Sequence, residues 1–492
     1  MLSGIPRRLA RQSGAYAAVA IAGSALGVLL LPVYTRVLSP AEFGLIALLD
    51  VLALLLTTVF SLGATAMVPF YYADEADPGR RRGCLGTLLI GITGINVLLT
   101  LVVITTAGVV VGALLPSVPV WPFVPVVAAT ALLEPYWIVA AAVLQIQERA
   151  STHSVLTFLR QVTANALRIV AVIVLDLGVL GFVGAGLVTA LVWLLPAAML
   201  LRRETTWSFA PRELWRALRV GGPTVPNNLL SYGFRAADRV VLERFATRDE
   251  IGLYYLALRI AEVGRLASDV FVSAWRPIFF KEAGRPGFAE SVVPIVIRTS
   301  AVAFIGLFVA GALFAPEIVG LLMAAEYAGA ALFVPPLLAA MALKGMYAPP
   351  YLMIWFRKKT GYLPLVSAAT LVVGLTATLV LASRWGAWGA AIAYALSWTV
   401  LFAITLGLGR RLYRAPYPWR EVVTASALAA VVVGVSTFVE PGLGGAAAKL
   451  ALLAGFGVAI VATGCVRIAE LRSALAPVRA VSRRRETTVT AR

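Results

Sequence analysis

The stretch LGTLLIGITGINVLLTLVVITTAGVVVGALL, residues 85–115, contains no charged side chain. A helix needs about 20 apolar residues to cross the hydrocarbon core of a bilayer, so this stretch is long enough to span a membrane. Similar uncharged runs recur at residues 13–34 and 422–439. A β-barrel would show short alternating segments in place of continuous runs. We therefore predict an all-α polytopic membrane protein.

The overall composition leads to the same fold class. Of the 492 residues, 60% are hydrophobic and 13% are charged, whereas soluble domains carry about 25% charged residues. The formal net charge is +18. In a soluble protein such an excess suggests nucleic acid binding, but in a membrane protein Lys and Arg gather in the cytoplasmic loops. We predict no nucleic acid partner.

Fourteen segments are apolar enough to cross a membrane, and alternate loops between them are rich in Lys and Arg. The positive-inside rule places these basic loops in the cytoplasm. Both termini are then cytoplasmic, in a multi-pass protein of the plasma (inner) membrane. The predicted spans are residues 13–35, 42–66, 84–115, 121–144, 153–175, 180–201, 218–242, 250–274, 291–314, 330–355, 362–383, 386–408, 422–439 and 446–466.

An internal repeat relates the two main parts of the chain at a constant shift of 208 residues. The matched pairs include Arg36 with Arg244, Glu42 with Glu250, Gly44 with Gly252, Gly178 with Gly386, and Gly181 with Gly389. We predict two six-helix halves, residues 1–208 and 209–416, then two further transmembrane helices in 417–466 and a basic cytoplasmic tail, 467–492. Equivalent residues are separated by an even number of spans, so the repeats are parallel. Repeated halves are typical of alternating-access transporters, and a channel or scaffold is a less favoured alternative.

Charged residues interrupt the apolar pattern on the seventh and eighth spans. The stretch LLSYGFRAADRVVLERF covers residues 229–245, and its charges follow spacings of three and four, as do those of the next span. Each set therefore lies on one helical face. The polar residues of this stripe are Asn228, Arg235, Asp238 and Arg239 on the seventh span, and Arg259, Glu262, Arg265 and Asp269 on the eighth.

The first half of the repeat shows that the fold does not require these charges. At the shift of 208, Arg235 corresponds to Gly27 and Arg259 to Val51. A charge at mid-bilayer costs about 2.5–3.5 kcal/mol, so the stripe must face protein or water. Two interpretations stay open. The charges pair across the two helices, or they form the wall of a polar cavity.

Several kinds of active site are absent from the sequence. Two cysteines, Cys84 and Cys465, and one histidine, His153, provide neither a disulfide framework nor a metal cluster. The phosphate-binding pattern G-x-x-x-x-G-K-[ST] does not occur. No set of nucleophile and base is recognisable. We predict that the protein is not an enzyme and that it uses no cofactor and no metal.

Three motifs resemble the polysaccharide transporter branch of the MOP flippase superfamily, the Wzx-type flippases of O-antigen and capsule. They are RVLSPAEFGL at residues 36–45, RFATRDEIGLY at 244–254 and GAWGAAIA at 386–393. The resemblance implies a flippase that moves polyprenyl-pyrophosphate-linked oligosaccharide from the inner to the outer leaflet, for lipopolysaccharide or other surface polysaccharide. It further implies two bundles around a cavity lined by spans one, two, seven and eight. Membrane lipids, a polysaccharide polymerase or glycosyltransferases are implied as partners.

The resemblance also suggests roles for the charged stripe. Cavity arginines of this family hold the pyrophosphate and sugar acids, which suits guanidinium geometry. The predicted substrate-binding residues are Arg235, Arg239, Arg259, Arg265 and Asn228. The predicted coupling or orienting residues are Asp238, Glu262, Asp269 and Asp50, the last only if the second span is suitably rotated.

Other functions remain open at this stage. A MATE-like cation-coupled multidrug exporter would favour an acidic cavity, and four arginines in the stripes argue against it. A peptidoglycan-precursor (lipid II) flippase and a membrane scaffold are further alternatives. The identity of the glycan, the driving ion and the oligomeric state are left open by the sequence.

Overall fold

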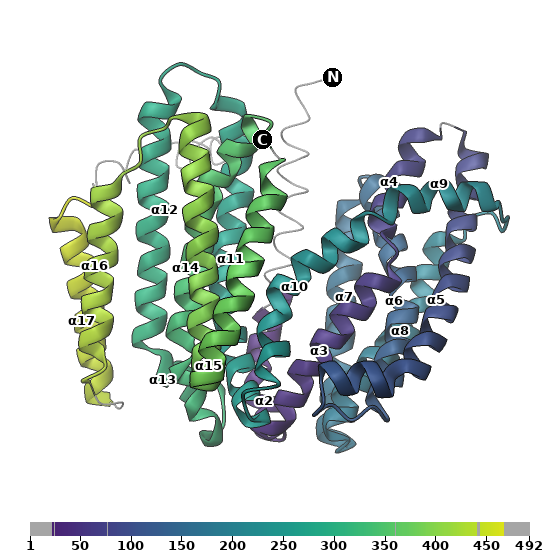
Figure 1. Cartoon of the computed structure of the whole chain (residues 1–492), viewed down its shortest axis with the longest axis horizontal. Coiled ribbons are helices and arrows are strands. Elements are labelled where there is room, and N and C mark those ends of the chain that lie inside the picture. Colours follow the sequence, from purple (N-terminus) through teal and green to yellow (C-terminus); the bar gives the residue numbers. More distant parts are fainter. Residues whose placement is uncertain (1–21, 24, 76, 360, 440–442, 467–492) are drawn as a thin grey trace, which may run out of the picture. The chain divides into compact units, whose positions relative to one another are not determined.

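The computed structural model describes residues 22–23, 25–75, 77–359, 361–439 and 443–466, without the side chains of Ser231, Phe234, Arg235 and Leu443. Every regular element in this part of the chain is a helix, so the predicted all-α class is confirmed (Figure 1). The elements are α2 (Leu31–Tyr34), α3 (Pro40–Phe60), α4 (Ala64–Asp74), α5 (Pro78–Leu114), α6 (Phe123–Ile146), α7 (Ala150–Ile169), η2 (Val170–Val174), α8 (Gly178–Leu201), α9 (Pro211–Gly221), α10 (Thr224–Leu242), α11 (Arg248–Glu282), α12 (Phe288–Leu313), α13 (Ala315–Leu322), η3 (Ala325–Leu332), α14 (Val334–Phe356), α15 (Tyr362–Tyr413), α16 (Trp419–Ser436) and α17 (Leu443–Ala462).

Ten candidate membrane spans occur among the described residues, judged by length and apolar composition. The charges of α10 and α11 keep these two helices out of that set. The longest element, α15, covers two predicted spans. It consists of two helices that meet at Gly386, where the backbone leaves the helical region with φ 54° and ψ −134°. The first predicted span is described only from residue 22 onwards, and most of this part is helical. Helices therefore lie where the sequence predicts spans.

The chain divides into two compact units by its internal contacts. The first unit comprises Met1–Val263, Gly320–Phe333 and Ser367–Tyr394, and the second comprises Gly264–Val319, Val334–Val366 and Ala395–Arg492. These units are defined by packing, whereas the predicted halves are defined by sequence equivalence. The division at residues 208 and 416 therefore stays a prediction.

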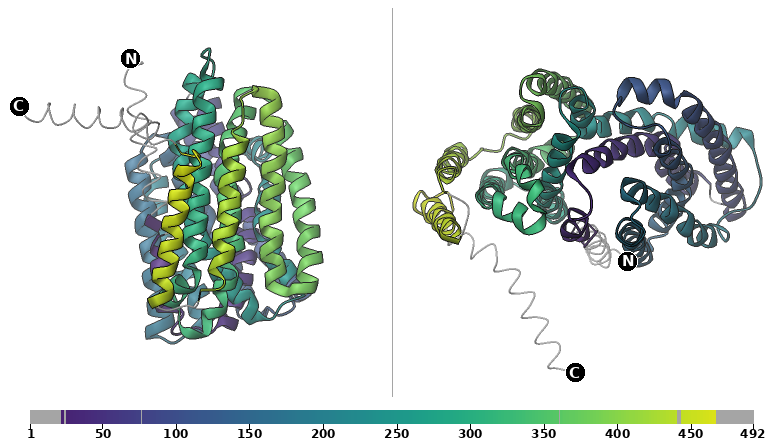
Figure 2. Two further views of the ribbon diagram at one scale, coloured as in Figure 1. Left: turned by 90° about the vertical axis from the view of Figure 1, so that its left-hand side faces the viewer. Right: turned by 90° about the horizontal axis from the view of Figure 1, so that it is seen from below.

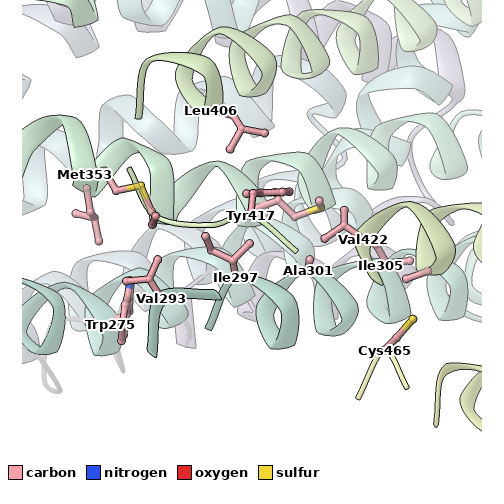
Figure 3. Packing of buried hydrophobic residues seen from close by; sticks show 14 of the residues in the cluster. Trp275, Val293, Ile297, Ala301, Ile305, Met353, Leu406, Tyr417, Val422 and Cys465 are labelled. Carbon is pink, nitrogen blue, oxygen red and sulfur yellow. The ribbon is translucent and has the colours of Figure 1, made fainter. Parts of the chain in front are cut away.

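The second unit is a bundle in which α12, α14, α16 and α17 run roughly parallel in both side views (Figures 1 and 2). Its core follows from residues spaced four apart on α12, which place Ile297, Ala301 and Ile305 on one face (Figure 3). Tyr417 and Val422 pack against this face. In a bilayer such contacts stabilise the bundle mainly through close packing, since lipid tails are as apolar as the side chains.

In the first unit, α3 and α11 begin with the same capping structure. Ser39 N donates to Glu42 Oε2 at 2.8 Å, and Glu42 N donates back to Ser39 Oγ at 3.3 Å. Thr247 N donates to Glu250 Oε2 at 3.1 Å, and Glu250 N donates to Thr247 Oγ1 at 3.3 Å. Such a capping box satisfies backbone N–H groups that the first helical turn leaves unpaired. The two boxes are equivalent at the shift of 208 residues.

These two helix starts touch each other reciprocally through glycine. A Cβ atom added at Gly44 would lie 2.0 Å from the carbonyl oxygen of Arg248, and one added at Gly252 would lie 2.0 Å from that of Pro40. Gly44 and Gly252 are repeat equivalents, and so are Pro40 and Arg248. We call this pair of close approaches the reciprocal glycine contact. Only glycine allows backbone and backbone to come this near.

Two connecting loops make a similar reciprocal pair of contacts, in which a side chain of each predicted half accepts a hydrogen bond from a loop of the other. Ala324 N donates to Thr35 Oγ1 at 3.3 Å, while Ser117 N donates to Glu243 Oε1 at 2.6 Å. Thr35 and Glu243 are equivalents at the shift of 208, and each side chain caps a loop of the other predicted half. The contacts are consistent with two parallel repeats.

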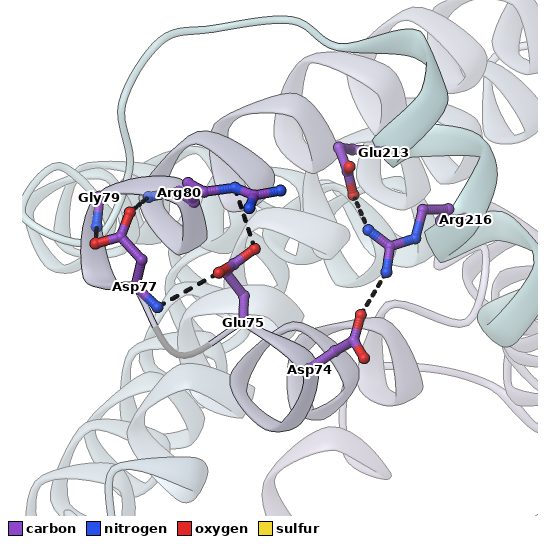
Figure 4. Close-up of polar contacts among 7 residues, drawn as sticks. All are labelled: Asp74, Glu75, Asp77, Gly79, Arg80, Glu213 and Arg216. Carbon is purple, nitrogen blue, oxygen red and sulfur yellow. Dashed lines mark hydrogen bonds and ion pairs between the residues drawn. The ribbon is translucent and has the colours of Figure 1, made fainter.

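Asp77 is the N-cap of α5 and its side chain is exposed (Figure 4). Its carboxylate accepts from Arg80 N at 2.9 Å and from Gly79 N at 3.3 Å. These bonds, the one from Arg80 first, lower the pKa of Asp77 below its ordinary value.

The cap makes stability depend on pH. A lowered carboxyl pKa contributes stability that is present above the ordinary aspartate pKa of about 3.9 and is lost as pH falls through the lowered value. We expect Asp77→Ala to lower the melting temperature at neutral pH, and the difference from wild type to shrink in acid. Thermal unfolding of purified protein between neutral and acid pH measures this. A difference that persists unchanged in strong acid would contradict the assignment.

Candidate functional site

The charged stripe lies on two continuous helices, as its spacing predicts. Asn228, Arg235, Asp238 and Arg239 are on α10, while Arg259, Glu262, Arg265 and Asp269 are on α11. Asn228 is partly buried. The side chain of Arg235 lies outside the described part of the structure. The remaining residues form three clusters, two in the first unit and one in the second.

The Asp238 cluster, in the first unit, comprises Asp238, Arg239 and Tyr254. Asp238 is 5% exposed, and Tyr254 donates its hydroxyl to Asp238 Oδ2 at 2.5 Å. Arg239 N donates to Asp238 Oδ1 at 2.9 Å, and Arg239 Nε lies 3.6 Å from the same oxygen. The carboxylate is thus neutralised inside the protein. This cluster fastens α10 to the beginning of α11.

This arrangement predicts unequal roles for two adjacent tyrosines. Tyr254→Phe removes one hydrogen-bond donor from a buried carboxylate, which lowers the free energy of unfolding by about 1–2 kcal/mol. Tyr255→Phe removes a similar hydroxyl from Asp50, which is 37% exposed and can recruit water. We expect a larger fall in melting temperature for Tyr254→Phe than for Tyr255→Phe. Equal falls would contradict a buried role for Asp238.

The Asp50 cluster, also in the first unit, joins α3 to α11. Tyr255 donates to Asp50 Oδ2 at 2.5 Å, and Arg259 Nη2 donates to the same oxygen at 3.0 Å. Arg259 Nη2 also donates to the Tyr255 hydroxyl, and its guanidinium carbon lies 4.8 Å from the ring centre. Asp50 therefore faces the charged stripe, as a suitably rotated second span requires.

The far side of Arg259 is open. Its Nη1 is 3.6 Å from Glu262 Oε2, too far for a hydrogen bond, and the side chain is 43% exposed. Two carboxylates, Asp50 and Glu262, surround this one guanidinium. Within the Asp50 cluster and Glu262, two negative charges therefore face one positive charge.

The Asp269 cluster, in the second unit, has the opposite balance. Arg265 Nη1 lies 2.9 Å from Asp269 Oδ2, and Lys344 Nζ lies 3.1 Å from Asp269 Oδ1. The three side chains are 32%, 21% and 49% exposed for Arg265, Lys344 and Asp269 respectively. Two cations share one carboxylate, so the cluster has one positive charge in excess. It is suited to binding an anion.

Sequence reasoning missed the tyrosines and some of the pairing. Tyr254 and Tyr255 carry no charge and look like part of the apolar run, although Tyr255 lies one helical turn before Arg259. Lys344 lies on α14, 75 residues from its partner Asp269. The ion pairs of the stripe lie within α10, within α11, and between α11 and α3 or α14. The seventh and eighth spans are joined by the hydrogen bond from Tyr254 to Asp238.

The fold has known counterparts among solved membrane transport proteins. A structure described as lipid II flippase MurJ in an inward closed conformation is similar, with a TM-score of 0.72 and 13% identity, and the match covers 91% of this chain and 97% of that one. An inward-facing multidrug resistance MATE family transporter of the MOP superfamily is similar, with a TM-score of 0.63 and 14% identity over 79% of this chain and 94% of that one. No curated protein sequence matches the chain. At such low identity these similarities establish the fold.

The apolar helices and this fold define a multi-pass helical membrane protein. The sequence narrows the class further. Residues 9–282 match the family model described as polysaccharide biosynthesis protein, which covers more than half of the chain. The chain belongs to this family of MOP-superfamily flippases. Membership of this family, which the three sequence motifs predicted, is therefore confirmed.

Proposed function

We propose that the protein carries polyprenyl-pyrophosphate-linked oligosaccharide from the cytoplasmic to the outer leaflet of the plasma membrane, by alternating access between two repeated halves. Family membership supports a flippase of polysaccharide biosynthesis. The observation that favours a pyrophosphate-linked substrate is the Asp269 cluster, where Arg265 and Lys344 share a single carboxylate and remain partly exposed.

The chemistry of this cluster suits a pyrophosphate group. A guanidinium offers planar, paired N–H donors to phosphate oxygens, and an ammonium adds a compact point charge. Asp269 holds both cations within hydrogen-bonding distance of its two oxygens, so they are placed for one ligand before it arrives. Such placement lowers the entropy lost on binding. We assign the head group of the lipid to Arg265 and Lys344.

The other clusters take different roles in this proposal. Arg259 keeps donors free toward its open side, and we assign it to sugar or phosphate oxygens, with Asp50 and Glu262 orienting it or coupling an ion. Arg239 is 12% exposed and bound to Asp238. We assign these two residues to holding α10 in position.

A second candidate is cation-coupled export of multidrug type. The two carboxylates around Arg259 favour it, as does the fold shared with a MATE family transporter. A third is transport of lipid II, which is itself pyrophosphate-linked and would use the same anion site. The three candidates differ in their cargo.

A transport assay with three cargoes separates these functions. The protein is reconstituted in liposomes with a labelled polyprenyl-pyrophosphate oligosaccharide, with labelled lipid II, or with a cationic dye. We expect movement of the oligosaccharide lipid, inhibited by an excess of unlabelled substrate. Movement of the dye alone would support the exporter, and preference for lipid II would support the third candidate.

A further inference from the structure

Residues 202–220 of the first unit present an exposed aromatic and basic surface that lies outside the three charged clusters described above. Trp207, Phe209 and Trp215 are 76%, 52% and 59% exposed. Arg202, Arg203, Arg212 and Arg219 lie among them and are exposed as well. We call these seven side chains the α9 surface.

The inner side of the same segment is hydrogen-bonded to α4 and α5. The exposed side chains therefore belong to a well-anchored segment. Thr87 donates its hydroxyl to the carbonyl oxygen of Ser208 at 3.0 Å, and Tyr71 donates to that of Glu213 at 3.0 Å. Ala217 is completely buried. α9 therefore packs on α4 and α5, running across their ends in Figure 1. The rings and guanidinium groups of the outer side are held away from this packing.

The charges of the α9 surface are not neutralised within the described structure. Arg216, on the same helix, is bound by Asp74 and Glu213 (Figure 4). The four arginines of the α9 surface have no carboxylate partner among the described residues. Arg219 instead lies over the ring of Trp215, at 5.5 Å from its centre. The segment thus offers four uncompensated positive charges beside three large apolar rings.

We propose that the α9 surface binds the head groups of anionic phospholipids at the membrane surface. Trp and Phe at this level enter the boundary between head groups and acyl chains, and guanidinium groups contact lipid phosphate. The stacked pair of Trp215 and Arg219 supplies both contacts from one helical turn. The positive-inside rule assigns this segment to the cytoplasmic leaflet, where anionic lipid concentrates.

Tryptophan quenching by brominated lipid tests the proposal. The full chain is placed in bilayers that contain either brominated phosphatidylglycerol or brominated phosphatidylcholine. We expect stronger quenching by the anionic lipid. The double variant Trp207→Phe with Trp215→Phe is expected to lose part of this extra quenching by the anionic lipid. The lost part is the signal that comes from the α9 surface.

Charge removal then decides the outcome. Arg212→Gln with Arg219→Gln is expected to remove about the same share of the excess while both tryptophans remain. Lys358→Gln with Lys359→Gln removes two exposed charges from the turn after α14 and is expected to remove none. An excess that survives the arginine variant, or an equal loss in the lysine variant, overturns the proposal. Melting temperatures of all variants show that each is folded.

Discussion

Replacing Arg265 and Lys344 together with glutamine is expected to reduce transport of the oligosaccharide lipid about 100-fold. A hydrogen bond to a charged group contributes about 1.5–3 kcal/mol, and about 1.4 kcal/mol corresponds to a factor of ten. Each single variant is therefore expected to lose about tenfold. The effect follows from the shared carboxylate, because both cations serve one anion site.

Two controls distinguish a lost anion site from general damage. Lys358→Gln with Lys359→Gln removes the same charge from an exposed turn and is expected to transport normally. Adding Asp269→Asn to the double variant removes the carboxylate left without partners. If that carboxylate alone caused the defect, the triple variant would recover transport. We expect it to remain inactive, because the anion still lacks its cations.

Alanine at Gly44 or Gly252 is expected to lower the melting temperature, although alanine is the better helix former by about 1 kcal/mol. Each new Cβ would lie 2.0 Å from a backbone carbonyl oxygen of the other helix start. Overpacking of this kind costs about 1–3 kcal/mol or more. Gly94 on α5 has open space around it, and Gly94→Ala is expected to leave the melting temperature unchanged or raise it.

The reciprocal glycine contact also predicts a non-additive pair. Once alanine at Gly44 has separated the starts of α3 and α11, alanine at Gly252 has less contact left to break. The double variant is therefore expected to lose less stability than the two single losses together. In a transporter that alternates between two states, the same variants are expected to favour the state in which this contact is open. If the single variants Gly44→Ala and Gly252→Ala melted at the same temperature as Gly94→Ala, the close approach of the two helix starts would be contradicted.

Much of the fold was predictable because it depends on local pattern. Uncharged runs gave the spans, and a spacing of three and four gave the stripe on α10 and α11. Ser39 and Glu42, which form the capping box of α3, are only three residues apart and so belong to the same kind of local pattern. The boundary between the predicted spans 362–383 and 386–408 was also correct, because the backbone leaves the helical region at Gly386 and α15 consists of two helices that meet there.

The composition of the clusters was harder to predict, because it depends on contacts between distant residues. Tyr255 meets Asp50 across 205 residues, and no periodicity relates them. Arg239 and Arg259 look alike in sequence, yet one is bound to a buried aspartate and the other is open on one side. The assignment of substrate-binding residues therefore remains a proposal.

The most direct test of the account is leaflet exposure of a labelled polyprenyl-pyrophosphate oligosaccharide in liposomes that contain the purified protein. The readout is the fraction of label that an impermeant reagent reaches over time. We predict rapid exposure with wild type and with the variant of Lys358 and Lys359, and exposure at the rate of empty liposomes with the folded triple variant of Arg265, Lys344 and Asp269. Equal rates for wild type and the triple variant would contradict the anion site, and a wild-type rate no faster than that of empty liposomes would contradict the proposed function itself.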